Sequence, residues 1–302
     1  MPTMPKNPTL APALDGRNLT VDQALKHPTA IRDRIVKIAD DLLVATAFYT
    51  PGGGPVQGGG LLYTTTRAAD QYLDGTLEER APGGEYKQLQ GVDPDAKLAP
   101  VRDWGAKFRI EDERRIRNDV DYLDQQTTQL TNTIAAKIDD EALRVLDAAL
   151  DDVIAEQTTI TGHSWGDAII TGPLDQLTPS GELPTADWSK AQLTADLQQL
   201  GVHHDVLVVH PSSAHALRVL YADKLANVLE SAGLQLISNN KVAVNSAYVA
   251  TKGQAGIIAF ETPLTVTLWP DPETRTTVVQ AFVVPAFAVT RPFHVKRILG
   301  IV

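Results

Sequence analysis

The sequence predicts an α+β fold in which one helix is much longer than any other. Three observations carry this prediction: an unbroken helical pattern fills the middle of the chain, short strands and helices alternate after it, and β-branched residues gather near its C-terminal end. The chain has 302 residues, of which 43% are hydrophobic and 21% are charged. This composition is that of a globular protein, and the length suffices for one large domain or two smaller ones.

Charge and cysteine content narrow the classes of function. The formal net charge of −10 argues against a protein whose main task is to hold nucleic-acid phosphates, because such proteins carry a basic excess. It leaves open a container that holds DNA without reading its sequence. The chain has no cysteine, which excludes disulfides and cysteine-bound metals and fits a reducing compartment. We expect no membrane partner, because there is neither a signal peptide nor an apolar run of about 18 residues.

Residues 1–50 are predicted to form an N-terminal arm followed by a short helix. Residues 1–28 contain few large apolar side chains and are broken by prolines, so they are expected to be extended and unable to fold alone. From Thr29 onward, apolar residues recur at three- and four-residue spacing. This spacing predicts an amphipathic helix with the buried positions Ile31, Ile35, Ile38 and Leu42.

Residues 51–105 are predicted to be a two-stranded ribbon that leaves the body of the protein. Glycine triplets at 52–54 and 58–60 allow sharp bends, and the run from Leu61 to Thr66 favours a strand. Turn pairs and too few apolar residues for a separate core follow this run. An isolated ribbon is marginally stable in water, so we expect this one to need a partner surface.

Residues 106–187 contain the strongest periodic signal, after a short strand predicted at 107–110. Neither Gly nor Pro occurs between Asp112 and Gln157, which predicts one helix of roughly twelve turns over 112–156. Its length, and the absence of a sustained charged pattern beside the apolar stripe, favour a strut across a broad domain over a coiled coil. The apolar stripe consists of Ile116, Val120, Leu123, Leu130, Ile134, Ile138, Val145 and Ala149.

The rest of the chain is predicted to alternate short helices and strands after a turn-rich connector over 162–184. Ser189 or Asp187 is expected to cap the first of these helices. Pro270, Pro272 and Pro285 are expected to separate the last strands. The predicted elements are helices at 189–200 and 211–231 and strands at 206–209, 242–250, 256–260, 264–268, 276–284 and 286–289.

One motif is typical of an enzyme. Gly162-His-Ser-Trp-Gly166 matches the G-x-S-x-G turn that carries the nucleophilic serine of α/β-hydrolases, with Asp205 and His294 as candidate triad partners. That turn normally joins a buried strand to a helix, whereas here a short polar strand precedes it and Gly172-Pro173 interrupts the segment after it. A surface turn is therefore the favoured interpretation, and a serine hydrolase using this turn stays open as an alternative.

No other group of residues predicts catalysis, a cofactor or a metal. Adjacent or nearby histidines occur at His203, His204, His210 and His215, but no pair has the i, i+4 spacing of metal ligands on a helix. The glycine triplets lack the Gly-Lys-Ser or Gly-Lys-Thr ending of a phosphate-binding loop. We therefore expect a protein that is not an enzyme, with no catalytic residue, no cofactor and no metal site.

The order of the elements resembles the major capsid protein of tailed bacteriophages, the Hong-Kong-phage-type fold that encapsulins share. The segment Val206-Leu-Val-Val-His-Pro-Ser-Ser-Ala-His-Ala-Leu217 is similar to the strand, proline turn and helix of that family, and Val283–Val295 looks like the terminal strand of actinobacteriophage capsid subunits. The resemblance implies a division of the chain into an arm with a short helix (1–50), an extension loop (51–105), a peripheral domain with a spine helix (106–187), an axial domain (188–272) and C-terminal strands that return to the peripheral domain (273–302).

The resemblance also implies a function. We expect pentamers and hexamers that form an icosahedral virion capsid around double-stranded DNA, assembled in the host cytoplasm and holding the DNA without sequence readout. Portal, decoration and scaffolding proteins are further expected partners, and the short segment before the arm indicates that any scaffold is a separate protein. An encapsulin-like shell loaded with protein stays open as an alternative.

Contacts between subunits are expected along the extension loop, since its apolar side chains lack a core of their own. The glycines around Pro55 are expected to act as hinges that let the loop tilt differently in pentamers and hexamers. Lys87 lies where some members of the family carry a covalent cross-link, but no Asn or Glu partner is evident and no cross-link is predicted. The candidate contact residues are Leu61, Leu62, Tyr63, Tyr86 and Leu89.

Overall fold

The computed structural model describes residues 44–52, 54, 56–153 and 158–302, together with Val21, Leu25, Thr29, residues 31–33 and Ile35. Most of the predicted arm and of the helix predicted from Thr29 therefore lies outside the described residues. Val21 and Leu25 fall within the predicted extended arm, yet both are helical, and Val21 is buried in the main core. The arm is thus not extended at these two positions, because their side chains pack against the body of the protein.

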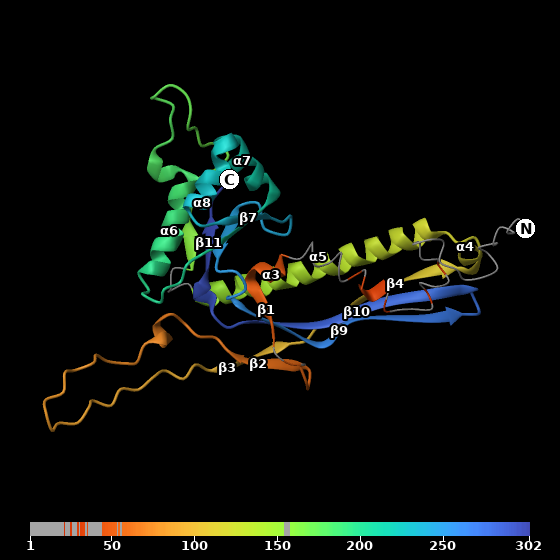
Figure 1. Ribbon diagram of the computed structural model, residues 1–302, viewed down its shortest axis with the longest axis horizontal. Coiled ribbons are helices and arrows are strands. Elements are labelled where there is room, and N and C mark those ends of the chain that lie inside the picture. Colours follow the sequence, from red (N-terminus) through yellow and green to blue (C-terminus); the bar gives the residue numbers. More distant parts are fainter. Residues whose placement is uncertain are drawn as a thin grey trace, which may run out of the picture.

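The body of the molecule is a four-stranded sheet with one long helix lying along it (Figure 1). The helix is α5 (Val120–Asp152), whose 33 residues pack on two of the strands. The combination of this helix with separate sheets confirms the predicted α+β class. In spatial order the strands are β1 (Tyr49–Pro51), β9 (Gly256–Asp271), β10 (Thr276–Val289) and β4 (Trp104–Glu111).

The helix predicted over 112–156 is divided in two. The first part, α4 (Asp112–Ile116), ends close to Asn118, whose backbone is left-handed at φ 55°, and α5 begins after Asp119. The Asp119 carboxylate accepts a hydrogen bond from the backbone N–H of Tyr122 at 3.2 Å. Asn tolerates the left-handed region and Asp is a good N-cap, so this pair breaks a helix that the apolar periodicity predicts to be continuous. Ile116, predicted to be buried, is 50% exposed because it belongs to the separate first helix.

The buried face of α5 follows the predicted stripe in its first half and departs from it in its second half. Leu123, Leu130, Ile134 and Ile138 are buried as expected. Val145 and Ala149 are only half-buried, because beyond Ala142 the helix packs under a second sheet and turns a different set of side chains inward. The side chains buried in the second half of α5 are Ala142, Leu143, Leu146 and Leu150.

No helix in the described part of the chain is long and apolar enough to cross a bilayer.

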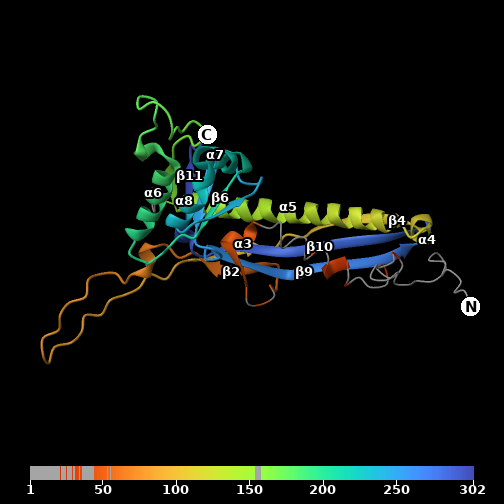
Figure 2. The same cartoon turned by 45° about the horizontal axis from the view of Figure 1, so that its top comes forward.

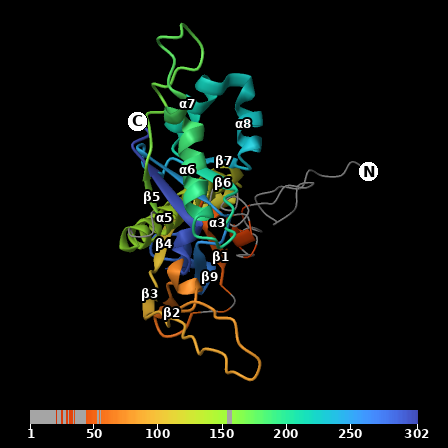
Figure 3. The same cartoon turned by 90° about the vertical axis from the view of Figure 1, so that its left-hand side faces the viewer.

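A second sheet of five strands lies at one end of α5. One face of this sheet packs on the core that contains α5, and its opposite face is covered by helices (Figure 3). Leu207 and Val209 pack against those helices, whereas Val206 and Val208 face the core that contains α5. Burial on both faces explains why residues 206–209 form an unbroken apolar run. In spatial order the strands are β5 (Thr159–Thr161), β11 (Val295–Leu299), β8 (Ser246–Ala250), β6 (Val206–Val209) and β7 (Gln235–Ser238), and the helices are α6 (Pro184–Asp196), α7 (Pro211–Tyr221) and α8 (Leu225–Ser231).

Several predicted bounds in this part of the chain change. The strand predicted at 206–209 is confirmed as β6. The helix predicted at 211–231 is interrupted by η4 (Ala222–Lys224), where Ala222 has a φ of 45°. Helix α6 starts five positions earlier than predicted, since Pro184 suits a first helical turn, and Asp187 is buried inside that turn and is not its cap. The strand predicted at 242–250 begins only at Ser246, because residues before it form a turn.

The short strands predicted between 256 and 289 are two long strands, β9 and β10, joined as a hairpin. Pro285 does not end β10, because the pairing with β9 is irregular between Phe282 and Pro285 and a bulge tolerates a residue without an N–H. Strand β9 therefore lies in the four-stranded sheet, although residues 188–272 were assigned to the axial part. Strand β11 lies in the five-stranded sheet, which differs from the predicted return of all of 273–302 to the sheet of the long helix.

The segment between β1 and β4 contains the ribbon. Strand β2 (Gly60–Thr64) pairs antiparallel with β3 (Ala96–Pro100), and residues 65–95 lead away from the body and return to it (Figure 2). That excursion contains η1 (Ala69–Gln71) and one isolated bridge between Asp74 and Gln90. The remaining short helices are α3 (Ala45–Phe48), η3 (Ser180–Glu182) and η5 (Pro292–His294).

Candidate assembly surfaces

The outer face of the ribbon carries a pair of exposed leucines. Leu62 on β2 and Leu98 on β3 are direct cross-strand partners, and they are 69% and 66% exposed. Because alternate side chains on a strand point to opposite faces, Leu61 points the other way and packs beside the buried Val56. The pair of leucines therefore forms an apolar surface that the chain does not cover in its described part.

The predicted contact residues fall into an exposed group and a half-buried group. Leu62 and Tyr86 are exposed, the latter at 77%. Leu61, Tyr63 and Leu89 are half-buried against the chain itself. The sequence-based prediction missed five further exposed apolar side chains on the same ribbon, because the sequence does not show which apolar side chains of a ribbon face outward. That group comprises Tyr72, Leu73, Leu77, Val92 and Leu98.

The base of the ribbon is fixed to both parts of the body. Thr66 N–H donates to the carbonyl of Thr290 at 2.8 Å, and the ammonium of Lys97 lies 2.6 Å from the carboxylate of Asp152 at the end of α5. Ala68 is buried in a small cluster that includes Phe293. Contacts of this kind hold the root of the ribbon in place, so the exposed outer part is presented at a defined position.

A second exposed surface is the loop between β5 and α6, the green loop that rises above α6 in Figure 1. Ile169 and Ile170 are partly exposed, and Leu174 is 90% exposed. Within the loop, the Thr178 hydroxyl accepts a hydrogen bond from Ile169 N–H at 2.8 Å, and Thr178 N–H donates to the Ile169 carbonyl at 2.9 Å. The loop therefore has internal order at its neck and presents an apolar tip.

The Gly162–Gly166 motif at the start of this loop forms a structural turn. Buried Asp187 accepts hydrogen bonds from His163 N–H at 3.1 Å and from the indole N–H of Trp165 at 2.9 Å, and its other oxygen lies 2.8 Å from His163 Nδ1. The Ser164 hydroxyl donates to Asp167 at 2.8 Å. Among the described contacts, none joins Ser164 to a histidine. Asp205, a predicted triad partner, instead accepts a hydrogen bond from Lys252 N–H at 2.7 Å.

The four histidines occupy separate environments. His203 and His215 are exposed, and His210 caps α7 by accepting from Ser212 N–H at 3.2 Å. His204 is buried, and burial is the main reason that its pKa is lowered to about 4. No group of three or more potential ligands in the described residues could hold a metal ion.

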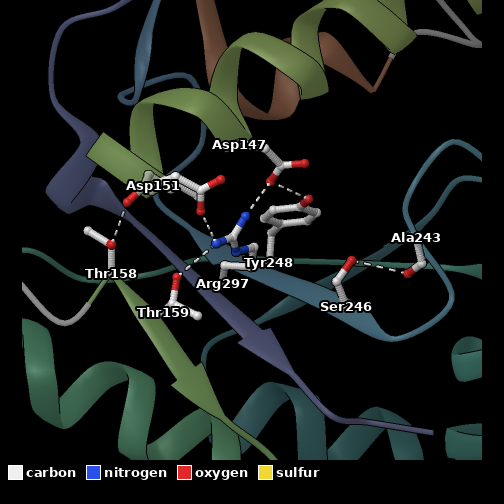
Figure 4. Close-up of polar contacts among 9 residues, drawn as sticks. Asp147, Asp151, Thr158, Thr159, Ala243, Ser246, Tyr248 and Arg297 are labelled. Carbon is white, nitrogen blue, oxygen red and sulfur yellow. Dashed lines mark hydrogen bonds and ion pairs between the residues drawn. The ribbon is translucent and has the colours of Figure 1, made fainter. Parts of the chain in front are cut away.

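A polar cluster joins α5 to the five-stranded sheet (Figure 4). Arg297 on β11 donates to Asp147 at 3.2 Å and to Asp151, both on α5, and to the Thr159 hydroxyl on β5 at 3.2 Å. The Tyr248 hydroxyl on β8 donates to the same Asp147 oxygen at 2.8 Å. Burial, followed by the charge of Asp147, raises the pKa of Tyr248, so the phenol stays a donor. The cluster fixes the orientation of the five-stranded sheet relative to the helix.

A second buried contact holds the segment before β1 against α5. Asp139 is 3% exposed, and its carboxylate accepts hydrogen bonds from Val44 N–H and Ala45 N–H, each at 3.0 Å. The Asn239 side chain donates to its other oxygen at 3.1 Å. Burial raises the pKa of Asp139 although these three donors oppose the shift. One carboxylate therefore positions three distant segments of the chain.

The profile of the family described as phage capsid protein matches residues 94–298, which is more than half of the chain. The chain belongs to the phage capsid protein family. No curated protein matches the sequence. The match covers α5, most strands of both sheets and the loop between β5 and α6, whereas most of the ribbon lies before it.

Solved structures agree with this assignment at the level of the fold. A virus-like particle from Pyrococcus furiosus is similar with a TM-score of 0.55 and 11% identity, over 89% of this chain and 98% of that one. A structure from Microbacterium phage Oxtober96 gives a TM-score of 0.58 and 12% identity, over 86% and 90% of the two chains. The capsid structure of the cyanophage P-SCSP1u gives a TM-score of 0.55 and 14% identity, over 84% of this chain and 86% of that one. The Hong-Kong-phage-type capsid fold predicted from the order of elements is confirmed.

Proposed function

We propose that this capsid protein is the major shell subunit of a tailed phage, and that its copies form pentamers and hexamers in an icosahedral capsid. The observation that supports this most is the ribbon, which presents the Leu62–Leu98 pair away from the body. A two-stranded ribbon with exposed apolar side chains is poorly stable alone and gains from burial on a neighbour. Many such contacts add up to a stable shell even where each is weak.

The parts of the chain would divide this work as follows. The four-stranded sheet and α5 form the flat wall as a peripheral domain, the five-stranded sheet with its helices forms the axial domain near the centre of each ring, and residues 51–105 reach over the adjacent subunit as the extension loop. The arm in 1–50 and the C-terminal strands in 273–302 complete the contacts between these parts. The axial boundary follows β6 to β8 more closely than the predicted range 188–272, because β9 belongs to the wall.

The proposed contents are double-stranded DNA, held without sequence readout. A net charge of −10 suits a wall from which DNA must be released, since a basic inner surface would bind phosphates strongly. The proposed site of assembly is the host cytoplasm, with a portal protein, a scaffold and decoration proteins as further partners.

The test is assembly of a Leu62→Ser/Leu98→Ser double variant, followed by negative-stain electron microscopy and size-exclusion chromatography. We expect wild-type shells, rings or sheets to be replaced by small folded species, because both exposed leucines lose their apolar contact with a neighbour. Val219→Ser on α7 is the matched control, since Val219 is also exposed at 68% but lies outside the ribbon. Normal shells from the double variant would contradict the proposed role of the ribbon.

A second candidate function is an encapsulin-like shell with protein contents. The similarity to the Pyrococcus furiosus virus-like particle, which spans 98% of that chain, favours keeping this candidate. The contents of shells purified from the native source distinguish the two functions. Double-stranded DNA protected from nuclease supports the phage capsid, and an enclosed protein without DNA supports the other.

A further inference from the structure

Strand β4 forms one edge of the four-stranded sheet, and the backbone groups on its outer side have no neighbouring strand. Asp112 N–H donates to the Arg275 carbonyl at 3.0 Å, one step beyond the last pair of β4 and β10. Opposite residues of antiparallel strands alternate between bonded and unbonded pairs, so the even-numbered residues of β4 bond to β10. The backbone N–H and C=O groups of Gly105 and Lys107 therefore point outward. Both residues are exposed, and among the described residues no other backbone group bonds to these groups.

A shallow hollow lies beside this open edge, on the sheet face opposite α5. Trp104 is on the α5 side, where the ammonium of Lys137 lies 5.6 Å from its ring, so the next residue, Gly105, belongs to the other face. Gly105 is the direct cross-strand partner of Phe282, which is only half-buried. An open strand edge beside an apolar hollow is an arrangement that binds an added strand. The hollow has a volume of about 360 Å³ and is lined by Asp103, Gly105, Ala106, Lys107, Gln280 and Phe282.

The open edge also carries a charge without a partner. Lys107 makes no ion pair among the described residues, whereas Arg109, the next side chain on the same face, lies 3.8 Å from the carboxylate of Asp271. The Arg109 carbonyl accepts a hydrogen bond from the Tyr122 hydroxyl at 3.3 Å, which covers the edge beyond Lys107. A lysine on an edge strand discourages indiscriminate pairing. It favours a strand that brings an acidic side chain to the same face.

The outer part of the ribbon contains such a segment. Residues 76–81 are exposed and form neither helix nor strand, and no backbone hydrogen bond joins residues 76–80 to another described residue. Leu77 is 89% exposed, and Glu79 makes no ion pair within the described part of the chain. Glu78, between them, is paired with Lys87 at 2.7 Å. In an extended segment Leu77 and Glu79 lie on one face, which matches the hollow and the free lysine of β4.

The ribbon cannot reach the β4 edge of its own chain. Thr66 and Lys97 tie its root to Thr290 and Asp152 of the body. From this root the outer part points away from β4 (Figures 1 and 2). A ribbon that occupies the edge must therefore come from a second copy.

We propose that residues 76–81 of a second copy add to the edge of β4 as a parallel strand, with Leu77 of that copy in the hollow beside Gly105. Parallel pairing then places Glu79 of that copy opposite Lys107, whereas antiparallel pairing would place it opposite Asp103. Like charges directly opposite each other destabilise a strand pair, so charge selects the parallel direction. This inference rests on the proposed function, since it names the surface of the neighbouring subunit that receives the ribbon.

Binding of a synthetic peptide of residues 72–92 to the full-length subunit tests this inference without requiring a shell. Thermophoresis of a fluorescently labelled subunit at nanomolar concentration, where copies stay apart, gives the Kd. We expect a Kd of about 0.1 to 1 mM and at least tenfold weaker binding of the peptide with Leu77→Ser. No saturable binding of the wild-type peptide up to about 5 mM, or equal binding of the two peptides, would overturn the inference.

A charge exchange locates the contact. Lys107→Glu in the subunit and Glu79→Lys in the peptide are each expected to weaken binding about tenfold, and together to restore the wild-type Kd to within about threefold. Lys190→Glu is the matched control, because Lys190 is exposed on α6, outside the four-stranded sheet, and should leave the Kd unchanged. An exchange that gives no recovery would refute the pairing of residue 79 with residue 107.

Two further variants test the backbone part of the contact. Lys107→Pro removes an outward N–H without breaking a bond to β10, whereas Lys107→Ala keeps that N–H. With the fold checked by circular dichroism, we expect peptide binding to be lost in the first variant and only weakened in the second. Equal binding by both would show that no strand adds to this edge. Wild-type shells without peptide binding would overturn this inference alone, and absence of any assembly would contradict the proposed function.

Discussion

At the scale of single residues, the buried polar groups of this protein act as ties between segments that are distant in the sequence. Asp139 joins α5 to residues near 44 and 239, and Asp187 joins α6 to the turn at 162–166. Neither role was predictable, because a carboxylate on a helix reads as a solvated side chain unless its tertiary neighbours are known. Asp187 is one of two residues that the sequence offers as a helix cap, and its contacts hold the Gly162–Gly166 segment, for which the sequence favours a surface turn over a nucleophile.

His204 makes the stability of the folded protein depend on pH. Its pKa is about 4 in the folded protein and about 6.5 in the unfolded chain, so between these values the unfolded chain binds a proton that the folded protein does not. Stability therefore falls as pH decreases from about 6.5 toward 4. By pH 4.5 the loss from this group is expected to be about 2 kcal/mol.

Urea denaturation of the subunit at pH 7 and at pH 4.5 measures this loss. His204→Asn should lose about 2 kcal/mol less than the wild type over the same interval, because it cannot titrate. Burial also lowers the pKa of His294, but that residue is present in both proteins and cancels in the comparison. An equal loss in both proteins would show that folding does not lower the pKa of His204.

At the scale of elements, strand register decides which ribbon residues are available for contacts. Leu61, Leu62 and Tyr63 are adjacent in the sequence, and the sequence alone could not say which of them faces outward. The pairing of Leu62 with Leu98 settles it, and it also reveals Leu98, whose sequence neighbours gave no signal. The strand predicted at 206–209 is confirmed, because its run of four apolar residues is typical of a buried strand. The helix break at Asn118 was not predicted, because the apolar periodicity continues on both sides of it.

The second glycine triplet is expected to be the hinge of the ribbon. Gly58 and Gly59 have φ values of 79° and 80°, a region that costs other residues about 1 kcal/mol or more each. Gly58→Ala/Gly59→Ala should therefore impair shell assembly, scored by electron microscopy, while the far-ultraviolet circular dichroism spectrum of the subunit is kept. Gly54→Ala is the matched control, since no atom lies within 4 Å of the added methyl group. Normal assembly of the double variant would argue against a hinge here.

At the scale of the whole molecule, the Arg297 cluster holds the five-stranded sheet on the end of α5. Arg297→Met is expected to reduce the free energy of unfolding by about 2 kcal/mol, because the side chain is 13% exposed and serves three partners. Arg297→Lys should recover only part of the lost stability, since an ammonium group cannot reproduce the planar array of N–H donors of a guanidinium group. Urea denaturation provides the measurement.

A surface ion pair provides the control for the Arg297 variants. Lys87 and Glu78 lie 2.7 Å apart on the exposed part of the ribbon, with side chains 47% and 63% exposed. Exposed pairs contribute between about 0 and 1 kcal/mol, so Lys87→Met should change stability little. If Arg297→Met were equally mild, the cluster would be a surface contact and would not fix the five-stranded sheet relative to α5.

The distribution of the strands between the two sheets was the feature that the sequence predicted least well. The order of elements led to the correct fold, but a turn in the sequence does not show whether the next strand stays in the same sheet or joins the other one. Strand β9 continues past Pro263 and Pro270 into the four-stranded sheet, and β11 leaves β10 for the other sheet after a single short η5 turn. Such crossings depend on which long-range pairings bury most surface. The contact between Gln192 on α6 and His204 could not be predicted for the same reason, since only the tertiary fold brings α6 beside residue 204.

The interior position of β11 in the five-stranded sheet has a consequence for biosynthesis. Residues 295–299 lie between β5 and β8, so the sheet stays in two pieces until β11 has left the ribosome. At about 5 to 20 residues per second, translation of the roughly 130 residues between β5 and β11 takes about 7 to 27 s. During that time the nascent chain exposes the unpaired edges of β5 and β8 to other nascent chains on the same messenger. Chaperones that shield strand edges during synthesis are therefore expected to determine the yield of subunits.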